Sequence, residues 1–168
     1  MNIIDKSFKL IDDIINNASI QSIGFYENVL KMVSSLYENK FSISIFFCEN
    51  TQYVLKSAIK GSQVFSNYSF KNNLQDFIQD KNKITKINTK KDELFFENTF
   101  AVKLAIRDSV FGFMTLSSTD KIEPEVEKTF EVIVGVISYK IKDYELNEVF
   151  KIQLKAMQEA INEKESAY

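Results

Sequence analysis

Apolar residues recur at helical spacing in two segments near the start of the chain. In the first, intervals of four, three and four positions put the apolar residues on one face, which predicts a helix within residues 1–18. The predicted buried face of this helix consists of Ile4, Phe8, Ile11 and Ile15. In the second, residues 25–37, the apolar stripe is so broad that we expect a helix with most of its surface buried.

The pattern then changes from helical spacing to alternation, which is typical of strands. The predicted strands are residues 41–48, 53–59, 83–88, 99–107 and 110–118. Short polar turns separate the first two strands and the last two, so we expect two antiparallel hairpins. Residues 60–82, with Gly61 and many Ser and Asn, indicate a crossover segment. This order of elements predicts an α+β fold, with a central antiparallel sheet of about five to six strands and the N- and C-terminal helices packed on one face.

One long helix is predicted from Pro124 to Ala167, because proline is tolerated in a first turn and only Gly135 interrupts the rest. About 40 residues at about 1.5 Å each extend roughly 60 Å, so the far end must project from a small domain. Its first half carries a broad apolar belt suited to burial: Val126, Phe130, Ile133, Val134, Ile137 and Ile141. Its second half carries a narrower seam: Leu146, Phe150, Leu154, Met157 and Ile161.

The seam predicts a homodimer. A lone amphipathic helix of this length would expose the seam to water, whereas a parallel partner helix would cover it. The alternative is that the tail folds back on the first helix or frays at its end.

Composition and charge exclude several function classes. A hydrophobic fraction of 45% and a charged fraction of 26% are typical of a globular chain, and a formal charge of -2 gives no field that attracts nucleic acid. The absence of histidine removes Ser-His-Asp catalysis, the usual zinc sites and a haem ligand. Four dispersed glycines form no phosphate-binding loop.

The same composition predicts where the chain works. The single cysteine, Cys48, cannot form an internal disulfide, and no apolar run is long enough for membrane insertion. We therefore expect a cytoplasmic protein with no cofactor, no nucleic-acid partner and no inserted segment.

The run TFAVKLAIRDSVFGFMTLSS, residues 99–118, consists of a strand, a polar turn and a second strand that contains an apolar-Gly-apolar step. This run resembles the last hairpin of GAF domains, the sensory modules of bacterial signalling proteins, and the resemblance covers about residues 20–145. It implies an N-terminal helix at 1–18, a sensory domain at 19–145 and a coupling coiled-coil helix at 146–168. It also implies an output domain in the same chain, a cyclic-di-nucleotide cyclase or phosphodiesterase or a histidine kinase.

The chain departs from the ligand motifs of known GAF subfamilies. Of the pattern that cyclic-nucleotide-binding members carry, only Lys121 is matched. Without histidine, bilin and haem binding are disfavoured, and Cys48 alone cannot support the chemistry of methionine-sulfoxide-reducing relatives. The resemblance therefore implies an unidentified small molecule as ligand, in a pocket on the sheet face opposite the helices.

Side-chain alternation suggests which residues line that pocket. In strand 41–48, Ile43, Ile45 and Phe47 are expected beneath the helices and the alternate residues toward the pocket. In strand 110–118, either Phe111, Phe113 and Thr115 or else Met114 and Leu116 face it, and the sequence leaves this open. The predicted ligand-binding residues are Ser44, Phe46, Tyr53, Phe70, Phe77, Phe95, Lys103 and Thr115. Alternatively, the phenylalanines fill a core and the lysine is solvated.

The predicted function is thus a non-catalytic domain that senses a small molecule, dimerises through its terminal helices and relays the ligand state to an output domain. One alternative is a structural dimerisation module with a filled core and no ligand. A small enzyme that uses Cys48 or a carboxylate is a third, less favoured interpretation, because Cys48 in a strand suggests an inert packed thiol.

Overall fold

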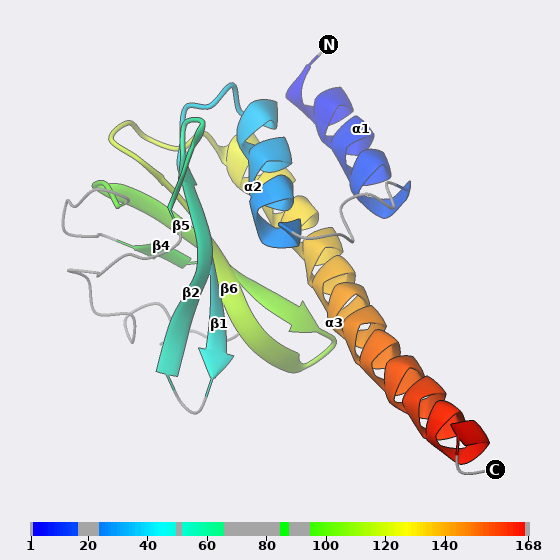
Figure 1. The fold of residues 1–168 in the computed structure, drawn as a ribbon. Coiled ribbons are helices and arrows are strands. Elements are labelled where there is room, and N and C mark those ends of the chain that lie inside the picture. Colours follow the sequence, from blue (N-terminus) through cyan, green and yellow to red (C-terminus); the bar gives the residue numbers. More distant parts are fainter. Residues whose placement is uncertain (1, 17–23, 50–51, 66–84, 88–94, 167–168) are drawn as a thin grey trace.

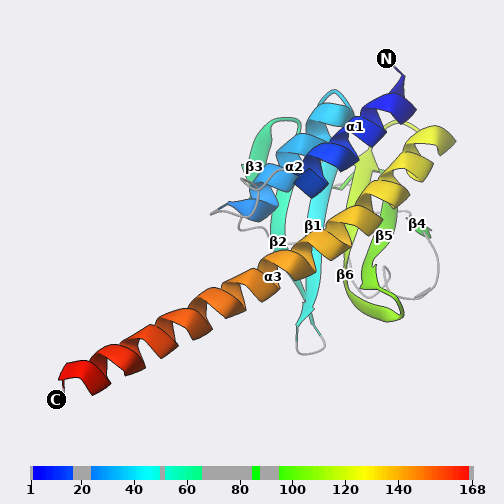
Figure 2. The same ribbon diagram turned by 90° about the vertical axis from the view of Figure 1, so that its right-hand side faces the viewer.

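In the computed structural model, which describes residues 2–16, 24–49, 52–65, 85–87 and 95–166, the helices lie on one face of a single sheet (Figures 1 and 2). The helices are α1 (Ile3–Asn16), α2 (Phe25–Leu36) and α3 (Pro124–Ser166). The strands are β1 (Ser42–Glu49), β2 (Gln52–Lys60), β3 (Gln63–Phe65), β4 (Thr85–Ile87), β5 (Asn98–Ile106) and β6 (Ser109–Ser118). The predicted α+β fold is confirmed. No helix in the described part of the chain is long and apolar enough to cross a membrane.

The sheet is built from two central hairpins placed side by side. Its order is β3-β2-β1-β6-β5-β4, and each neighbouring pair is antiparallel. The short strand β3 falls inside the segment interpreted as a crossover. Gly61 turns the chain back there with a φ of 62°, a left-handed conformation that glycine adopts without strain. A strand of three residues has too few positions to show an alternation, so the sequence did not predict it.

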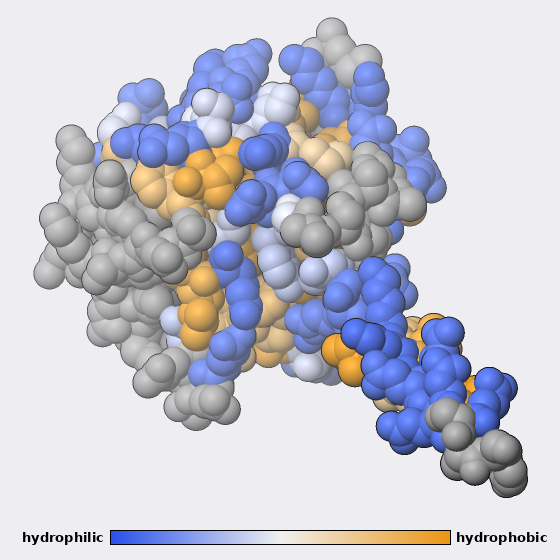
Figure 3. All heavy atoms as spheres, in the orientation of Figure 1, coloured by the Kyte–Doolittle hydropathy of each residue, from blue (hydrophilic) through white to orange (hydrophobic). Residues whose placement is uncertain are grey.

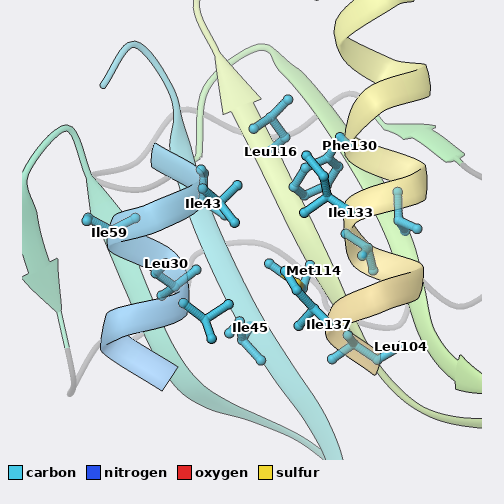
Figure 4. Close-up of a cluster of buried hydrophobic side chains, with 14 of the residues drawn as sticks. Leu30, Ile43, Ile45, Ile59, Leu104, Met114, Leu116, Phe130, Ile133 and Ile137 are labelled. Atoms are coloured by element: carbon cyan, nitrogen blue, oxygen red, sulfur yellow. The ribbon is translucent and has the colours of Figure 1, made fainter. Parts of the chain in front are cut away.

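The main core lies between the sheet and the helices (Figure 4). We call the sheet face toward the helices the inner face and the opposite one the outer face. The inner face carries Ile43 and Ile45 from β1, Met114 and Leu116 from β6, and Leu104 from β5, all of them fully buried. The burial of Ile43, Ile45 and Phe47 beneath the helices, predicted from alternation, is confirmed.

Helix α3 divides into a packed half and a projecting half. The predicted belt is buried: Phe130, Ile133, Val134, Ile137 and Ile141 are fully inaccessible, and Val126 is half-buried. The helix has 43 residues, and from Val149 to Glu165 every side chain is exposed. In Figure 3 this projecting part presents mostly hydrophilic residues, with hydrophobic ones visible along its edges. The predicted extension of the helix beyond the domain is therefore correct.

The face by which α1 packs differs from the prediction. The buried residues are Ser7, Leu10 and Ile14, whereas Ile4, Phe8 and Ile15 of the predicted stripe are exposed. Helix α1 carries apolar residues over an arc wide enough for two stripes, and the stripe that includes Leu10 and Ile14 is the one that contacts the core. The other stripe is left uncovered.

Tyr37, at the end of α2, makes the core sensitive to high pH. Its hydroxyl lies 2.9 Å from Thr129 Oγ1 of α3. Burial raises the pKa of Tyr37 from 10.0 to about 12, although the hydrogen bond with Thr129 acts in the opposite direction. Above about pH 10, Tyr37 of the unfolded chain loses its hydroxyl proton, whereas Tyr37 of the folded protein keeps it up to about pH 12. The free energy of unfolding therefore falls as the pH rises between these two values.

We expect the free energy of unfolding to fall by up to roughly 1.4 kcal/mol per pH unit through Tyr37 between about pH 10 and pH 12. Burial also raises the pKa of Tyr26, which adds to the same trend. The substitution Tyr37→Phe should flatten the pH profile, and urea unfolding at a series of alkaline pH values measures this. An unchanged slope in Tyr37→Phe would contradict the assignment.

Candidate functional site

The outer face of the sheet carries a row of small side chains across its four central strands. Ser44 of β1 pairs with Ala58 of β2 on one side and with Thr115 of β6 on the other. Thr115 in turn pairs with Ala101 of β5. Because paired residues in a sheet point to the same face, these four side chains form one continuous strip. We call it the small-residue row.

An aromatic row runs beside the small-residue row. Phe46 pairs with Leu55 and Phe113, and Phe113 pairs with Lys103. The rings of Phe46 and Phe113 are stacked with centroids 4.8 Å apart, and Phe95 stacks on Phe46 at 6.3 Å. These three rings are buried. Together with Ala58 and Ala101 of the small-residue row they form a second, smaller core.

Two hydroxyls in the small-residue row lack a hydrogen-bond partner. Ser44 Oγ and Thr115 Oγ1 are buried, and neither has a partner in the described part of the chain. A buried hydroxyl without a partner destabilises the folded state by about 1–3 kcal/mol, so adjacent ones call for an explanation. The neighbouring pair Thr99 and Ser117 is satisfied by contrast, with hydroxyl oxygens 2.8 Å apart.

Two more hydroxyls in the described residues lack partners, but they lie outside the small-residue row. Ser42 Oγ belongs to the next row of the outer face, and Ser57 pairs with Ile45 on the inner face. Ser44 and Thr115 differ from these because they pair with each other across β1 and β6, and each also pairs with an alanine on its other side.

The structure brings together six of the eight predicted ligand-binding residues. Ser44, Phe46, Tyr53, Phe95, Lys103 and Thr115 all belong to the outer face or pack against it. Phe70 and Phe77 lie outside the described residues. That these side chains bind a ligand stays a prediction.

The pairing shows which residues of β6 lie on the outer face. Phe113 and Thr115 lie on the outer face, whereas Met114 and Leu116 lie on the inner face. Phe111 packs with the inner core instead of following Phe113. The cause is a bulge opposite Leu104 and Ala105, which breaks the alternation at Phe111.

The sequence did not single out Ala58 and Ala101, which belong to the small-residue row. An alanine in a strand has no chemistry that would single it out, and its meaning appears only when the strands are aligned. The register of the two hairpins is the signal that would have found both.

Two other features contribute less to a site. Cys48 is exposed at the end of β1, so the expectation of a packed thiol was wrong.

A hollow of about 560 Å³ lies on the helix side, where α1, the turn after α2 and the start of α3 meet, and Lys121 lines it. Its three lysines are balanced by three carboxylates: the charged residues are Lys6, Lys40, Lys121, Glu38, Asp120 and Glu123. No cluster of His, Cys, Asp or Glu among the described residues could hold a metal ion.

No protein-family model and no curated protein sequence matches this chain. Solved structures do match it. The GAF domain of a phosphoenolpyruvate-protein phosphotransferase from Coxiella burnetii is 11% identical with a TM-score of 0.64, covering 89% of this chain and 98% of that one. The GAF domain of the corresponding Acinetobacter protein is 15% identical with a TM-score of 0.61, covering 88% and 99%.

A third solved structure is the GAF domain of the cyanobacteriochrome TePixJ, which is 10% identical with a TM-score of 0.50 and covers 71% of this chain and 88% of that one. Sequence identities this low show that the chains share a fold, and they say nothing about which ligand this chain binds. The two central hairpins, the helices gathered on the inner face and these likenesses lead to one conclusion: the chain has the fold of a GAF domain.

Proposed function

We propose that this domain is a non-catalytic sensor that binds a small molecule on the outer face of its sheet. In this proposal it forms a homodimer through its terminal helices and relays the ligand state along α3 to an output domain. The observation that carries the proposal is the pair of buried, unpartnered hydroxyls of Ser44 and Thr115 within the small-residue row. A ligand that accepts or donates hydrogen bonds there would satisfy both groups.

The composition of the outer face indicates the chemistry of the ligand. In this proposal the ligand lies over the alanines and short hydroxyl side chains and against the rings of the aromatic row. Lys103, at the end of the aromatic row, would attract an anionic group. The favoured ligand therefore has a flat apolar part and a polar edge that reaches Ser44 and Thr115.

Strand β5 offers a route from this site to α3. Ala101 and Lys103 belong to the outer face, whereas Phe100, Val102 and Leu104 pack in the inner core with α3. The amide of Ala105 also donates a hydrogen bond of 3.2 Å to Ser138 Oγ of α3. A ligand that displaces β5 would thus move α3, provided that it binds the two positions with different affinity.

The proposed output is a cyclic-di-nucleotide cyclase or phosphodiesterase, or a histidine kinase, joined to this domain in one chain. The solved GAF domains from Coxiella burnetii and Acinetobacter are likewise described as parts of a larger protein, a phosphotransferase. A rival function is a purely structural dimerisation module. The complete burial of Phe46 and Phe95 favours it, because those rings fill part of the outer face.

The substitution Thr115→Val tests the proposal. Valine has the shape of threonine without its hydroxyl, so the ligand-free protein should gain roughly 1 kcal/mol in unfolding free energy while ligand binding weakens. Stability is measured by urea unfolding. Binding is measured by native mass spectrometry of the purified protein and by thermal shifts across a metabolite panel.

Ser117→Ala is the matched control, because Ser117 Oγ already accepts a hydrogen bond of 2.8 Å from the amide of Phe96. Loss of this hydrogen bond in Ser117→Ala should lower the free energy of unfolding by about 1 kcal/mol. If the unmodified protein retains no small molecule and no metabolite shifts its melting temperature, the structural module is the correct function.

A further inference from the structure

The hollow on the helix side of the domain has an apolar floor that packs against the main core. Figure 1 shows the start of α1, the turn after α2 and the segment before α3 at the same end of the domain. The large apolar residues that line the hollow are half-buried and come from four segments of the chain: Ile3, Leu36, Phe41 and Val126. Apolar side chains that converge in this way on one concave space are typical of a ligand site.

The hydroxyl groups that line the hollow are already engaged within the protein. The hydroxyl of Tyr37 lies 2.9 Å from Thr129 Oγ1, and Ser118 Oγ accepts a hydrogen bond of 3.1 Å from the amide of Asp120. The floor therefore offers apolar contact to a ligand, and polar recognition depends on the charged side chains of the rim.

One group of charged side chains on the rim carries a net positive charge. It consists of Lys6 of α1 with Glu38 and Lys40 of the turn after α2. Lys40 Nζ lies 2.9 Å from Glu38 Oε2. This contact with Lys40, followed by the charge of Lys6, lowers the pKa of Glu38, so the three groups lie close together. One carboxylate near two ammonium groups leaves one positive charge unbalanced.

A second group on the rim carries a net negative charge. It consists of Asp120, Lys121 and Glu123, in the segment that joins β6 to α3. All three side chains are exposed, and none of them forms an ion pair within the described part of the chain. Two carboxylates and one ammonium group leave one negative charge unbalanced.

This division of charge indicates the chemistry of a ligand. The rim as a whole is neutral, so it does not favour a simple anion or a simple cation. A ligand with a carboxylate at one end and an ammonium group at the other would meet an opposite charge on both walls. A compact space of about 560 Å³ is roughly 10 Å across, and two or three extended residues span about 7–11 Å. In a single amino acid both charges are attached to one carbon atom, so it cannot span this space.

We propose that the hollow is a second binding site, which takes a zwitterionic peptide of two or three residues with apolar side chains. The carboxylate of the peptide contacts Lys6, its amino group contacts Asp120 and Glu123, and its side chains lie on the apolar floor. The inference goes beyond the proposed function and does not rest on it, because the hollow and the outer face lie on opposite sides of the sheet. A peptide bound there would hold the start of α1 against the first turn of α3.

Isothermal titration calorimetry with leucyl-leucine tests whether the site exists. We expect saturable binding with a dissociation constant below about 1 mM, which is the range of an efficient ligand of this size. Leucyl-leucinamide lacks the carboxylate and N-acetyl-leucyl-leucine lacks the ammonium group, so each should bind about fivefold more weakly. If neither leucyl-leucine nor leucyl-leucyl-leucine binds, the inference is wrong.

Charge variants of the rim show where the peptide binds. Lys6→Gln should weaken the binding of leucyl-leucine about fivefold and leave that of leucyl-leucinamide unchanged, because the amide has no carboxylate for Lys6 to contact. Asp120→Asn combined with Glu123→Gln should weaken leucyl-leucine by a similar factor and leave N-acetyl-leucyl-leucine unchanged. All of these side chains are exposed, so urea unfolding should show a stability equal to that of the natural protein.

The matched controls are Lys9→Gln on α1 and Glu125→Gln on α3, because both side chains are exposed and neither lines the hollow. Both controls should bind leucyl-leucine like the natural protein. If the controls weaken binding as much as the rim variants do, the peptide is attracted by surface charge in general and the inference fails.

Thr115→Val separates this site from the outer face. We expect it to bind leucyl-leucine like the natural protein, because Thr115 lies across the sheet from the hollow. If Thr115→Val weakens binding and the rim variants do not, the peptide is a ligand of the outer face. That result would support the proposed function and overturn the second site.

Discussion

Replacing Gly112 with alanine is expected to lower the free energy of unfolding by roughly 3 kcal/mol or more. A Cβ at this position would lie 2.1 Å from the carbonyl oxygen of Phe46, across the β1–β6 pair. The atoms that this Cβ would meet belong to the backbone of β1 at Phe46 and Phe47, so they cannot rotate away as a side chain could. Relief of the clash must separate β1 from β6, which also disturbs the stacked rings of Phe46 and Phe113.

Urea unfolding of Gly112→Ala measures this effect, and Gly135→Ala is the matched control. Gly135 lies within α3, and open space surrounds it. Alanine is about 1 kcal/mol more favourable than glycine within a helix, so this variant should be more stable than the natural protein. If Gly112→Ala unfolds like the natural protein, the register between β1 and β6 is wrong, and the small-residue row with it.

The four long strands, β1, β2, β5 and β6, and the long helix could be predicted because their patterns are local. In β1, Ser44 and Phe46 alternate with Ile43 and Ile45, and such an alternation describes only one kind of element. In α3, a first-turn proline and a long run without strong breakers leave few alternatives to one helix. In such segments the tertiary structure has little to add to the local preference.

The packing of α1 could not be predicted because it depends on which half of a wide apolar arc meets the domain. Leu10 and Ile14 were as apolar as Phe8 and Ile15, and only contact with the rest of the fold decides between them. The exposure of Phe8 is informative for this reason. It shows that hydrophobic periodicity identifies an amphipathic helix but does not say whether its partner is its own domain or another molecule.

The candidate site was half visible in the sequence. The alternation of side chains in β1 predicted that Ser44 and Phe46 point away from the helices, and they do. In β6 the bulge at Phe111 interrupts the alternation, so the sequence could not show which residues share a face. The burial of the Ser44 and Thr115 hydroxyls without partners depends on strands far apart in the chain, which no local pattern reports. The chemistry of the site therefore emerges from the strand register and not from any motif.

The substitution Phe150→Asp is expected to dissociate the proposed dimer. Each copy would lose an aromatic side chain from the seam and bring a carboxylate into it, and the symmetry doubles the effect. Together these changes destabilise the pair by about 4 kcal/mol, which is roughly a thousandfold in the dissociation constant. Phe150 is exposed in the single chain, so its replacement should leave the stability of the domain itself unchanged.

Sedimentation equilibrium of Phe150→Asp beside Ile152→Asp measures this difference, because Ile152 lies on the same helix but outside the seam. Ile152→Asp should dimerise like the natural protein. A dimer that survives Phe150→Asp would show that the seam is not its interface. Ligand binding by the monomeric variant should also be measured. Because the outer face lies on the opposite side of the sheet from α3, a monomeric Phe150→Asp protein should still bind the ligand of the natural dimer. Loss of both together would mean that the site is completed by the second copy, and that sensing and dimerisation are one event.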